Sequence, residues 1–285
     1  MKAVQKGFSL LELIAVMAIM AILAGAMAPN IASRIDAAYR DAERDNLATL
    51  AQNLREAIVE QKRIPSMRAQ SWTQAIASVS AYSAGRIARN DKGYRRRLLI
   101  DPQFYSDSAR PSREYVQNRG LRQRPYSPRM MLVSSLGGEL RLPALGVEAF
   151  DAIWNQYETA VLREGGDVLI ERIHLAAYFH RLVLSNRHSS ERPFFQLENG
   201  DRQALPRARN NADSSVTRYV LHNTQIALYQ APFPSGSKQQ TALVQSDTAM
   251  RYQPLERTGS QDDDDDNNNR GGRERSATGG VWVQP

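Results

Sequence analysis

A single acidic residue, Glu12, interrupts the apolar stretch near the N-terminus of this chain. The stretch runs from Leu10 to Ala28, and about 20 apolar residues are enough for a helix to cross a bilayer. A carboxylate among lipid tails costs about 2.5 to 3.5 kcal/mol on insertion scales. Glu12 is therefore expected to be a functional residue, and pairing with a cation is the chemistry that it can supply.

The residues before Glu12 point to that cation. Residues 6–12 read Lys-Gly-Phe-Ser-Leu-Leu-Glu, and this segment resembles the processing signal of type IV pilins and of type II secretion pseudopilins. The resemblance implies that prepilin peptidase cuts after Gly7 and that the new amine of Phe8 is methylated. It also implies that Glu12 neutralises the Phe8 amine of a neighbouring subunit during filament assembly. Pro29 falls where many members of that family carry a proline.

Two simpler interpretations also fit parts of this segment. A secretory signal peptide would also show basic residues, an apolar core and an Ala-x-Ala end, here Ala-Met-Ala at 26–28. However, Pro29 is a poor context for signal peptidase, and Glu12 lies inside the stretch that should be apolar. A plain membrane anchor explains the hydrophobicity but neither the Gly7-Phe8 pair nor Glu12. The pilin-type interpretation is therefore preferred.

Orientation follows from the basic residues Lys2 and Lys6, which precede the apolar stretch. The leader should stay cytoplasmic, and the chain beyond about residue 30 should lie on the far side of the inner membrane, in the periplasm or outside the cell. The resemblance implies a single-pass inner-membrane protein that enters a filament after assembly. Its implied partners are prepilin peptidase, other pilin or pseudopilin subunits, the inner-membrane assembly platform and the lipid bilayer. The absence of cysteine excludes disulfides. Many type IV pilins close a C-terminal loop with a disulfide whereas pseudopilins often lack one, so the resemblance favours a pseudopilin.

Arginines and tyrosines alternate between residues 86 and 129, a composition that suits phosphate neutralisation with base stacking. The candidate nucleic-acid residues are Arg95, Arg96, Arg97, Arg122 and Arg124. A DNA-binding minor pilin of an uptake machine is therefore the alternative function. The preferred interpretation is a solvated basic loop or a surface that docks on an acidic neighbour.

An acidic run near the C-terminus could supply oxygen ligands to calcium, with Asp262, Asp264 and Asp266 as the candidates. Calcium loops need ligands at spaced positions around a turn, whereas a homopolymeric acid run between glycines is typical of disorder. We therefore expect no cofactor, and calcium is the alternative.

A metal enzyme would have to use Glu171, His174, His180, His188 and Glu191. A single Glu-x-x-His is insufficient, because di-metal helices use two such motifs with further carboxylates. The chain also has no HExxH motif, phosphate-binding glycine loop or nucleophile elbow. Ordinary structural histidines and a non-enzymatic protein are expected. A membrane-tethered metal enzyme remains the third alternative.

A long helix from residue 9 to about residue 62, on the order of 80 Å in length, should position Glu12. Beyond Pro29, apolar residues at steps of three to five predict one buried face, and charged residues such as Glu43 are assigned to the opposite face. Pro65 cannot continue the helix. The predicted buried face comprises Ile31, Ile35, Ala38, Ala42, Leu47, Leu50, Leu54 and Ile58.

The remaining chain is predicted to be mixed. We expect helices over 72–88 and 150–162, two strands about a Gly137-Gly138 turn within 129–142, and strands over 194–197 and 216–229. Asn199-Gly200 is a good tight-turn sequence. Residues 168–184 fit a buried helix or strand equally well, and residues 281–283 are expected to dock as a short strand.

The predicted fold class is α+β: a long N-terminal helix, membrane-embedded in its first half, packs on an antiparallel β-sheet globular domain, as in pilins. The length of 285 residues leaves room for a second subdomain. The predicted function is a structural subunit of a type II secretion pseudopilus or type IV pilus. The expected divisions are a leader at 1–7, a transmembrane or filament-core helix at 8–29, its amphipathic half at 30–64, a globular domain at 65–256 and a low-complexity tail at 257–285.

Overall fold

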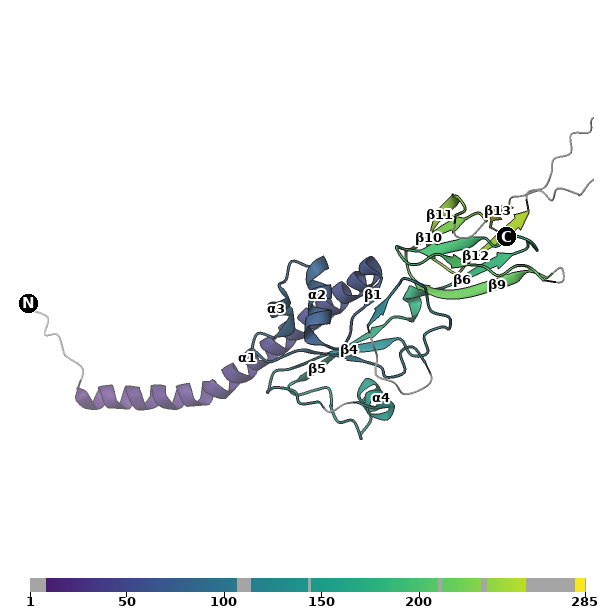
Figure 1. Cartoon of the computed structure of the whole chain (residues 1–285). Coiled ribbons are helices and arrows are strands. Elements are labelled where there is room, and N and C mark those ends of the chain that lie inside the picture. Colours follow the sequence, from purple (N-terminus) through teal and green to yellow (C-terminus); the bar gives the residue numbers. More distant parts are fainter. Residues whose placement is uncertain are drawn as a thin grey trace, which may run out of the picture.

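The protein is elongated, with a long helix at one end and a β-sandwich at the other (Figure 1). A computed structural model describes residues 9–106, 114–142, 145–209, 212–231, 235–254 and 280–284. Between the two ends lies a three-stranded sheet with helices on both of its faces. The α+β class is therefore confirmed.

The long helix α1 (Leu10–Gln61) contains 52 residues, which corresponds to about 78 Å at 1.5 Å per residue. Ser9 caps its N-terminus, and the backbone continues as a helix through Pro29. The helix stops at Lys62, which adopts the left-handed conformation with φ 53°. The predicted extent from residue 9 to about 62 is confirmed.

The central sheet has the order β2-β4-β5, from β2 (Arg97–Ile100), β4 (Arg129–Ser135) and β5 (Val168–His174), all antiparallel. Strand β4 is buried on both faces: Met130 and Leu132 pack with α1, whereas Met131 and Val133 pack with α4 (Val147–Asn155). Burial on both sides explains why this strand is a continuous apolar run rather than an alternating one.

Smaller elements complete this part of the molecule. Helices α2 (Ala69–Val79) and α3 (Ala84–Ala88) replace the single helix that was predicted over 72–88, because Ser83 caps a separate helix at Arg86. The short strands β1 (Arg63–Ile64) and β3 (Tyr115–Val116) pair with each other.

The hairpin predicted within 129–142 is wrong. The partners of β4 are β2 and β5, and residues 139–142 form no strand. The backbone N–H of Leu136 donates to the carbonyl of Asp167, at 2.8 Å. The backbone of β4 therefore forms its hydrogen bonds with β2 and β5 instead of with a neighbouring strand across a turn at Gly137-Gly138.

The C-terminal part is a sandwich of two four-stranded sheets, ordered β11-β10-β7-β8 and β13-β12-β6-β9. Its pairs are antiparallel except β6 with β12, which are parallel. The strands are β6 (Phe179–Asn186), β7 (Phe194–Leu197), β8 (Gln203–Ala204), β9 (Ser214–Leu221), β10 (Thr224–Tyr229), β11 (Lys238–Val244), β12 (Thr248–Pro254) and β13 (Gly280–Val283).

The sandwich has its own core between the two sheets, which includes Leu184, Phe195, Tyr252 and Trp282. The predicted turn at Asn199-Gly200 is confirmed, because the Gly200 N–H donates to the Leu197 carbonyl at 2.9 Å. The predicted strand at 281–283 is also confirmed, as part of β13. The last part of the assigned low-complexity tail therefore belongs to a folded sheet.

The ambiguous segment 168–184 crosses from one part of the molecule to the other. It forms β5 of the central sheet, the 3₁₀ turn η1 (Ala176–Tyr178) and the start of β6 in the sandwich. Hydrogen bonds hold the junction: Lys62 Nζ donates to the His222 carbonyl at 3.0 Å, and the Leu221 N–H donates to Gln117 Oε1 at 3.2 Å.

Candidate functional site

The N-terminal turn of α1 places Glu12 against Ser9. The Ser9 backbone N–H donates to Glu12 Oε2 at 3.0 Å, and the Glu12 backbone N–H donates to Ser9 Oγ at 3.4 Å. This reciprocal pair is a capping box, which satisfies two of the helix N–H groups that have no helical partner. In the isolated chain, the exposed Glu12 carboxylate therefore caps the helix to which it belongs. Gly7 and Phe8 lie outside the described residues.

The first turns of α1 expose apolar side chains around the whole helix. Leu10 and Leu11 are both 78% exposed, and even Val16 is 46% exposed. An amphipathic surface helix would bury one stripe, so these residues have no cover within the described chain. The exposed set is Leu10, Leu11, Leu13, Ile14, Val16, Met17, Ile19, Met20, Ile22 and Leu23. Within the described residues, no helical segment meets the length and hydropathy needed to cross a membrane.

The predicted buried face of the second half is correct only from the middle of the helix onward. Leu47, Leu50, Leu54 and Ile58 are buried in the central core. By contrast, Ile31, Ile35, Ala38 and Ala42 are exposed, because the globular part does not extend over that region. The periodic spacing describes which face is apolar, whereas the position of the globular part decides how much of that face is covered.

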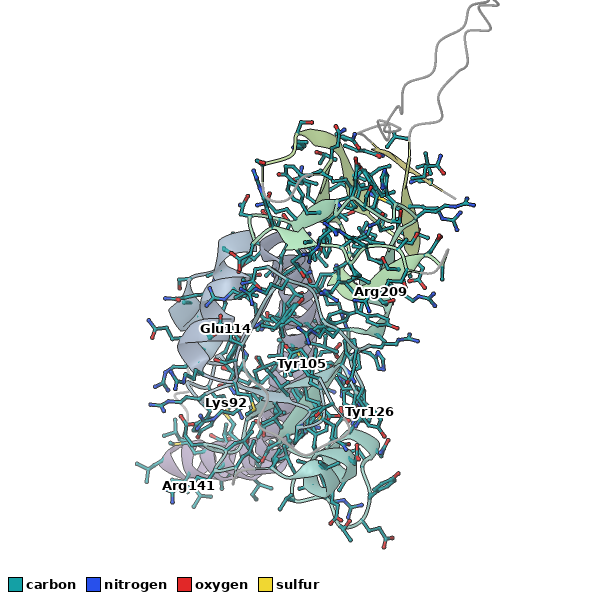
Figure 2. The ribbon with its side chains drawn as sticks, turned by 45° about the vertical axis from the view of Figure 1, so that its right-hand side comes forward. Lys92, Tyr105, Glu114, Tyr126, Arg141 and Arg209 are labelled. Carbon is teal, nitrogen blue, oxygen red and sulfur yellow. The ribbon has the colours of Figure 1, made fainter. Side chains whose placement is uncertain are left out.

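Among the residues of α1 whose burial the structure describes, the first buried one is the acidic Glu43, which the sequence pattern assigns to the polar face. Its side chain is 2% exposed and forms an ion pair with Arg96. Near this boundary, Lys92, which is labelled in Figure 2, pairs with Asp36 at 3.2 Å and lies over the Tyr39 ring. The sequence did carry a signal for the buried acid: Glu43 stands four residues before Leu47, on the apolar stripe.

Comparison with known families adds one match at this same end of the chain. Residues 2–28 match the family model described as the prokaryotic N-terminal methylation motif. The chain carries the type IV pilin and pseudopilin signal. This signal covers the leader and the exposed first part of α1, and it includes Gly7, Phe8 and Glu12. Comparison with curated proteins and with solved structures gives no match.

The five arginines proposed as a nucleic-acid patch do not form one surface. Arg96 is buried against Glu43, so its inclusion in an exposed patch is wrong. Arg97 pairs with Val133 near the C-terminal end of β4, and the Arg95 backbone N–H donates to Glu139. Arg122 and Arg124 are exposed in the loop that precedes the opposite end of β4. The two sets thus lie toward opposite ends of β4, where Val133 and Arg129 are about 13 Å apart along the strand.

The residues considered for a metal enzyme do not converge either. His180 Nε2 lies 2.9 Å from His222 Nδ1 at the start of β6, whereas His188 follows the other end of β6 and lies beside Glu191. Partial burial, with a smaller contribution from His222, lowers the pKa of His180, and Asp247 opposes this shift. Among the described residues, no three histidine or carboxylate side chains gather as a metal site. Asp262, Asp264 and Asp266 lie outside the described residues.

Proposed function

We propose that the protein is a structural subunit of a type II secretion pseudopilus or a type IV pilus. Prepilin peptidase removes residues 1–7, Phe8 becomes the methylated N-terminus, and the subunit is then drawn from the inner membrane into a filament. The match of residues 2–28 to the methylation motif carries this proposal.

The exposed apolar half of α1 supports the same proposal. Apolar patches larger than a few hundred Å² are rare on monomeric soluble proteins and mark sites of interaction with proteins or membranes. The proposed surroundings of Leu10 to Leu23 are lipid before assembly and the equivalent helices of other subunits afterwards. The membrane position of residues 8–29, with a cytoplasmic leader and an extracytoplasmic globular part, belongs to this proposal.

Glu12 has two roles in this scheme. Before assembly it closes the capping box with Ser9. In the filament it pairs with the Phe8 amine of a neighbour, because a charge among apolar helices is tolerated only when it is paired. No feature of the described residues favours the DNA-uptake alternative.

The N-terminus of the mature protein tests the proposal. The full chain is produced with and without prepilin peptidase, and the membrane-extracted protein is analysed by mass spectrometry. We expect residue 8 as the N-terminus, carrying one methyl group, only when the peptidase is present. Gly7→Val should retain the leader, because a bulky side chain blocks the cut.

Gly25→Val is the matched control, since it adds the same side chain to the apolar stretch away from the cut, and its processing should be normal. An intact Met1 in the presence of an active peptidase would refute the proposal. An N-terminus at Pro29 would instead identify an ordinary signal peptide.

A further inference from the structure

We propose that an open groove beside the central sheet binds an uncharged oligosaccharide. The groove has a volume of about 840 Å³ and lies between the loop 124–129, the C-terminal end of α4 and the end of β5. This inference does not depend on filament assembly, because the groove lies outside α1.

Two exposed tyrosines line this groove. Tyr126 is 62% exposed and Tyr157 is 57% exposed, and Figure 2 shows Tyr126 at the molecular surface beside α4. Other exposed tyrosines in the described chain, Tyr39 and Tyr82, are only 41% and 36% exposed. Because both rings are exposed to water in the same groove, they form a surface on which an apolar face of a ligand can pack.

Both rings stand on restrained backbone. Tyr126 lies between the buried Pro125 and Pro128, whose rings fix their own backbone angles. Tyr157 follows the left-handed residue Gln156 at the end of α4, and its N–H donates to the Ala152 carbonyl at 2.9 Å. A surface that is already ordered loses less entropy when a ligand binds.

The groove floor is a neutralised ionic network. Arg129 donates to Asp101 through Nε at 2.9 Å and Nη2 at 2.6 Å, and it also pairs with Asp151. Its guanidinium lies over the rings of Phe150 and Trp154, at 5.5 and 5.1 Å from their centroids. Arg129 is therefore fixed in place, with its charge already balanced by carboxylates.

The groove wall offers both hydrogen-bond donors and acceptors. The Ala176 N–H donates to His174 Nδ1 at 3.2 Å, so the neutral ring carries its proton on Nε2 and can donate to a ligand. The exposed Asn155 supplies an amide, and the half-exposed Asp151 supplies carboxylate oxygens. A ligand with many hydroxyl groups matches this mixture, because each hydroxyl both donates and accepts.

The charges select an uncharged ligand. Among the described residues, Arg124 and Arg129 are balanced by Asp151, which lines the groove, and by the buried Asp101 behind Arg129, so these residues leave no excess of positive charge to hold a polyanion. A pyranose ring has an apolar C–H face that can stack on tyrosine and an edge of neutral hydroxyls. An oligosaccharide of such rings therefore fits both the two aromatic surfaces and the polar wall.

The test is binding of the purified full chain to a glycan array and, for the hits, saturation-transfer NMR. A polyoxyethylene detergent is used, because alkyl maltosides carry a sugar that would compete. The array contains neutral hexose and N-acetylhexosamine oligosaccharides, with sialylated and sulfated glycans and single-stranded DNA as charged arms. We expect binding of at least one neutral oligosaccharide.

Tyr126→Ala and Tyr157→Ala should each weaken that binding at least tenfold, whereas Tyr126→Phe should retain most of it. Tyr82→Ala is the matched control, because it removes an exposed tyrosine outside the groove, and it should bind like the wild type. Thermal unfolding verifies that each variant is folded. No neutral glycan bound by the wild type, binding confined to the charged arms, or unchanged affinity in both alanine variants would each overturn the proposal.

Discussion

Arg96 forms a buried bidentate ion pair with Glu43, although the two residues are 53 positions apart in the sequence. Nε lies 2.7 Å from Oε1 and Nη2 lies 2.6 Å from Oε2, and the two side chains are 4% and 2% exposed. The remaining nitrogen, Nη1, donates to the carbonyls of Arg86 and Ile87 at the end of α3. One guanidinium thus joins α3 to the point on α1 where burial begins.

We predict that Glu43→Ala lowers the free energy of unfolding by about 3 to 5 kcal/mol, because it leaves a buried, unpaired cation. Arg96→Lys should not be conservative, since one ammonium cannot reach both the carboxylate and the carbonyls of α3. Urea unfolding of the full chain in detergent measures the free energy of unfolding of both variants. Asp41→Ala is the control: its pair with Arg44 is exposed, and the change should cost less than about 1 kcal/mol. A similarly small loss for Glu43→Ala would contradict the prediction.

Substitutions at Glu12 can separate its capping role from its charge. Gln at position 12 keeps an oxygen that can accept from the Ser9 N–H but has no negative charge, whereas Ala loses both. We expect both variants to be cut normally and both to enter filaments poorly when mixed with wild-type subunits. Asp41→Asn, which removes an exposed charge further along α1, should assemble normally. Normal assembly of Glu12→Gln with failure of Glu12→Ala would show that the cap, and not the charge, matters.

The partial burial of His180, with a smaller contribution from its contact with His222, makes the stability sensitive to acid. Because the pKa of His180 is lowered from 6.5 in the folded state, the unfolded chain binds more protons between the two values. The stability is therefore fully present above about pH 6.5 and is lost as the pH falls from there toward the folded-state pKa. We expect His180→Gln to flatten the dependence of unfolding free energy on pH between 7.5 and 5. Parallel pH profiles for both proteins would rule out this contribution.

We predict that most of the segment between β12 and β13, residues 255–279, can be removed, because its two ends lie next to each other. Pro254 and Gly280 are direct partners in the antiparallel pair, so a short turn can join the strands. Replacing residues 257–278 with a few glycines and serines should leave the melting temperature unchanged, because this tract is almost entirely polar. Trp282→Ala, which truncates a side chain in the sandwich core, should cost about 3 to 5 kcal/mol.

Proteolysis of the unaltered chain with and without calcium tests the same tract for metal binding. We expect cleavage within residues 257–278 that calcium does not suppress. Protection by calcium that disappears in an Asp264→Asn variant would instead assign a metal site to the acidic run.

Local features of the sequence were sufficient for the long helix and for the pilin-type signal. Ser9 and Glu12 form their capping box within one turn, and the helix ends at Lys62, three residues before Pro65, which cannot continue it. The signal at Gly7, Phe8 and Glu12 is likewise a short contiguous pattern. Interactions of this kind depend on neighbours in the chain, so they can be predicted from composition and spacing.

Only the tertiary structure decided where burial begins on α1, which partners β4 takes and where segment 168–184 divides. Each depends on residues far apart in sequence: Glu43 becomes a core residue because Arg96 reaches it, and β4 is central because β2 and β5 flank it. An apolar run has similar periodicity whether it lies in one sheet or crosses between two. The oligosaccharide groove is likewise tertiary, since folding brings Tyr126 and Tyr157 together from separate elements.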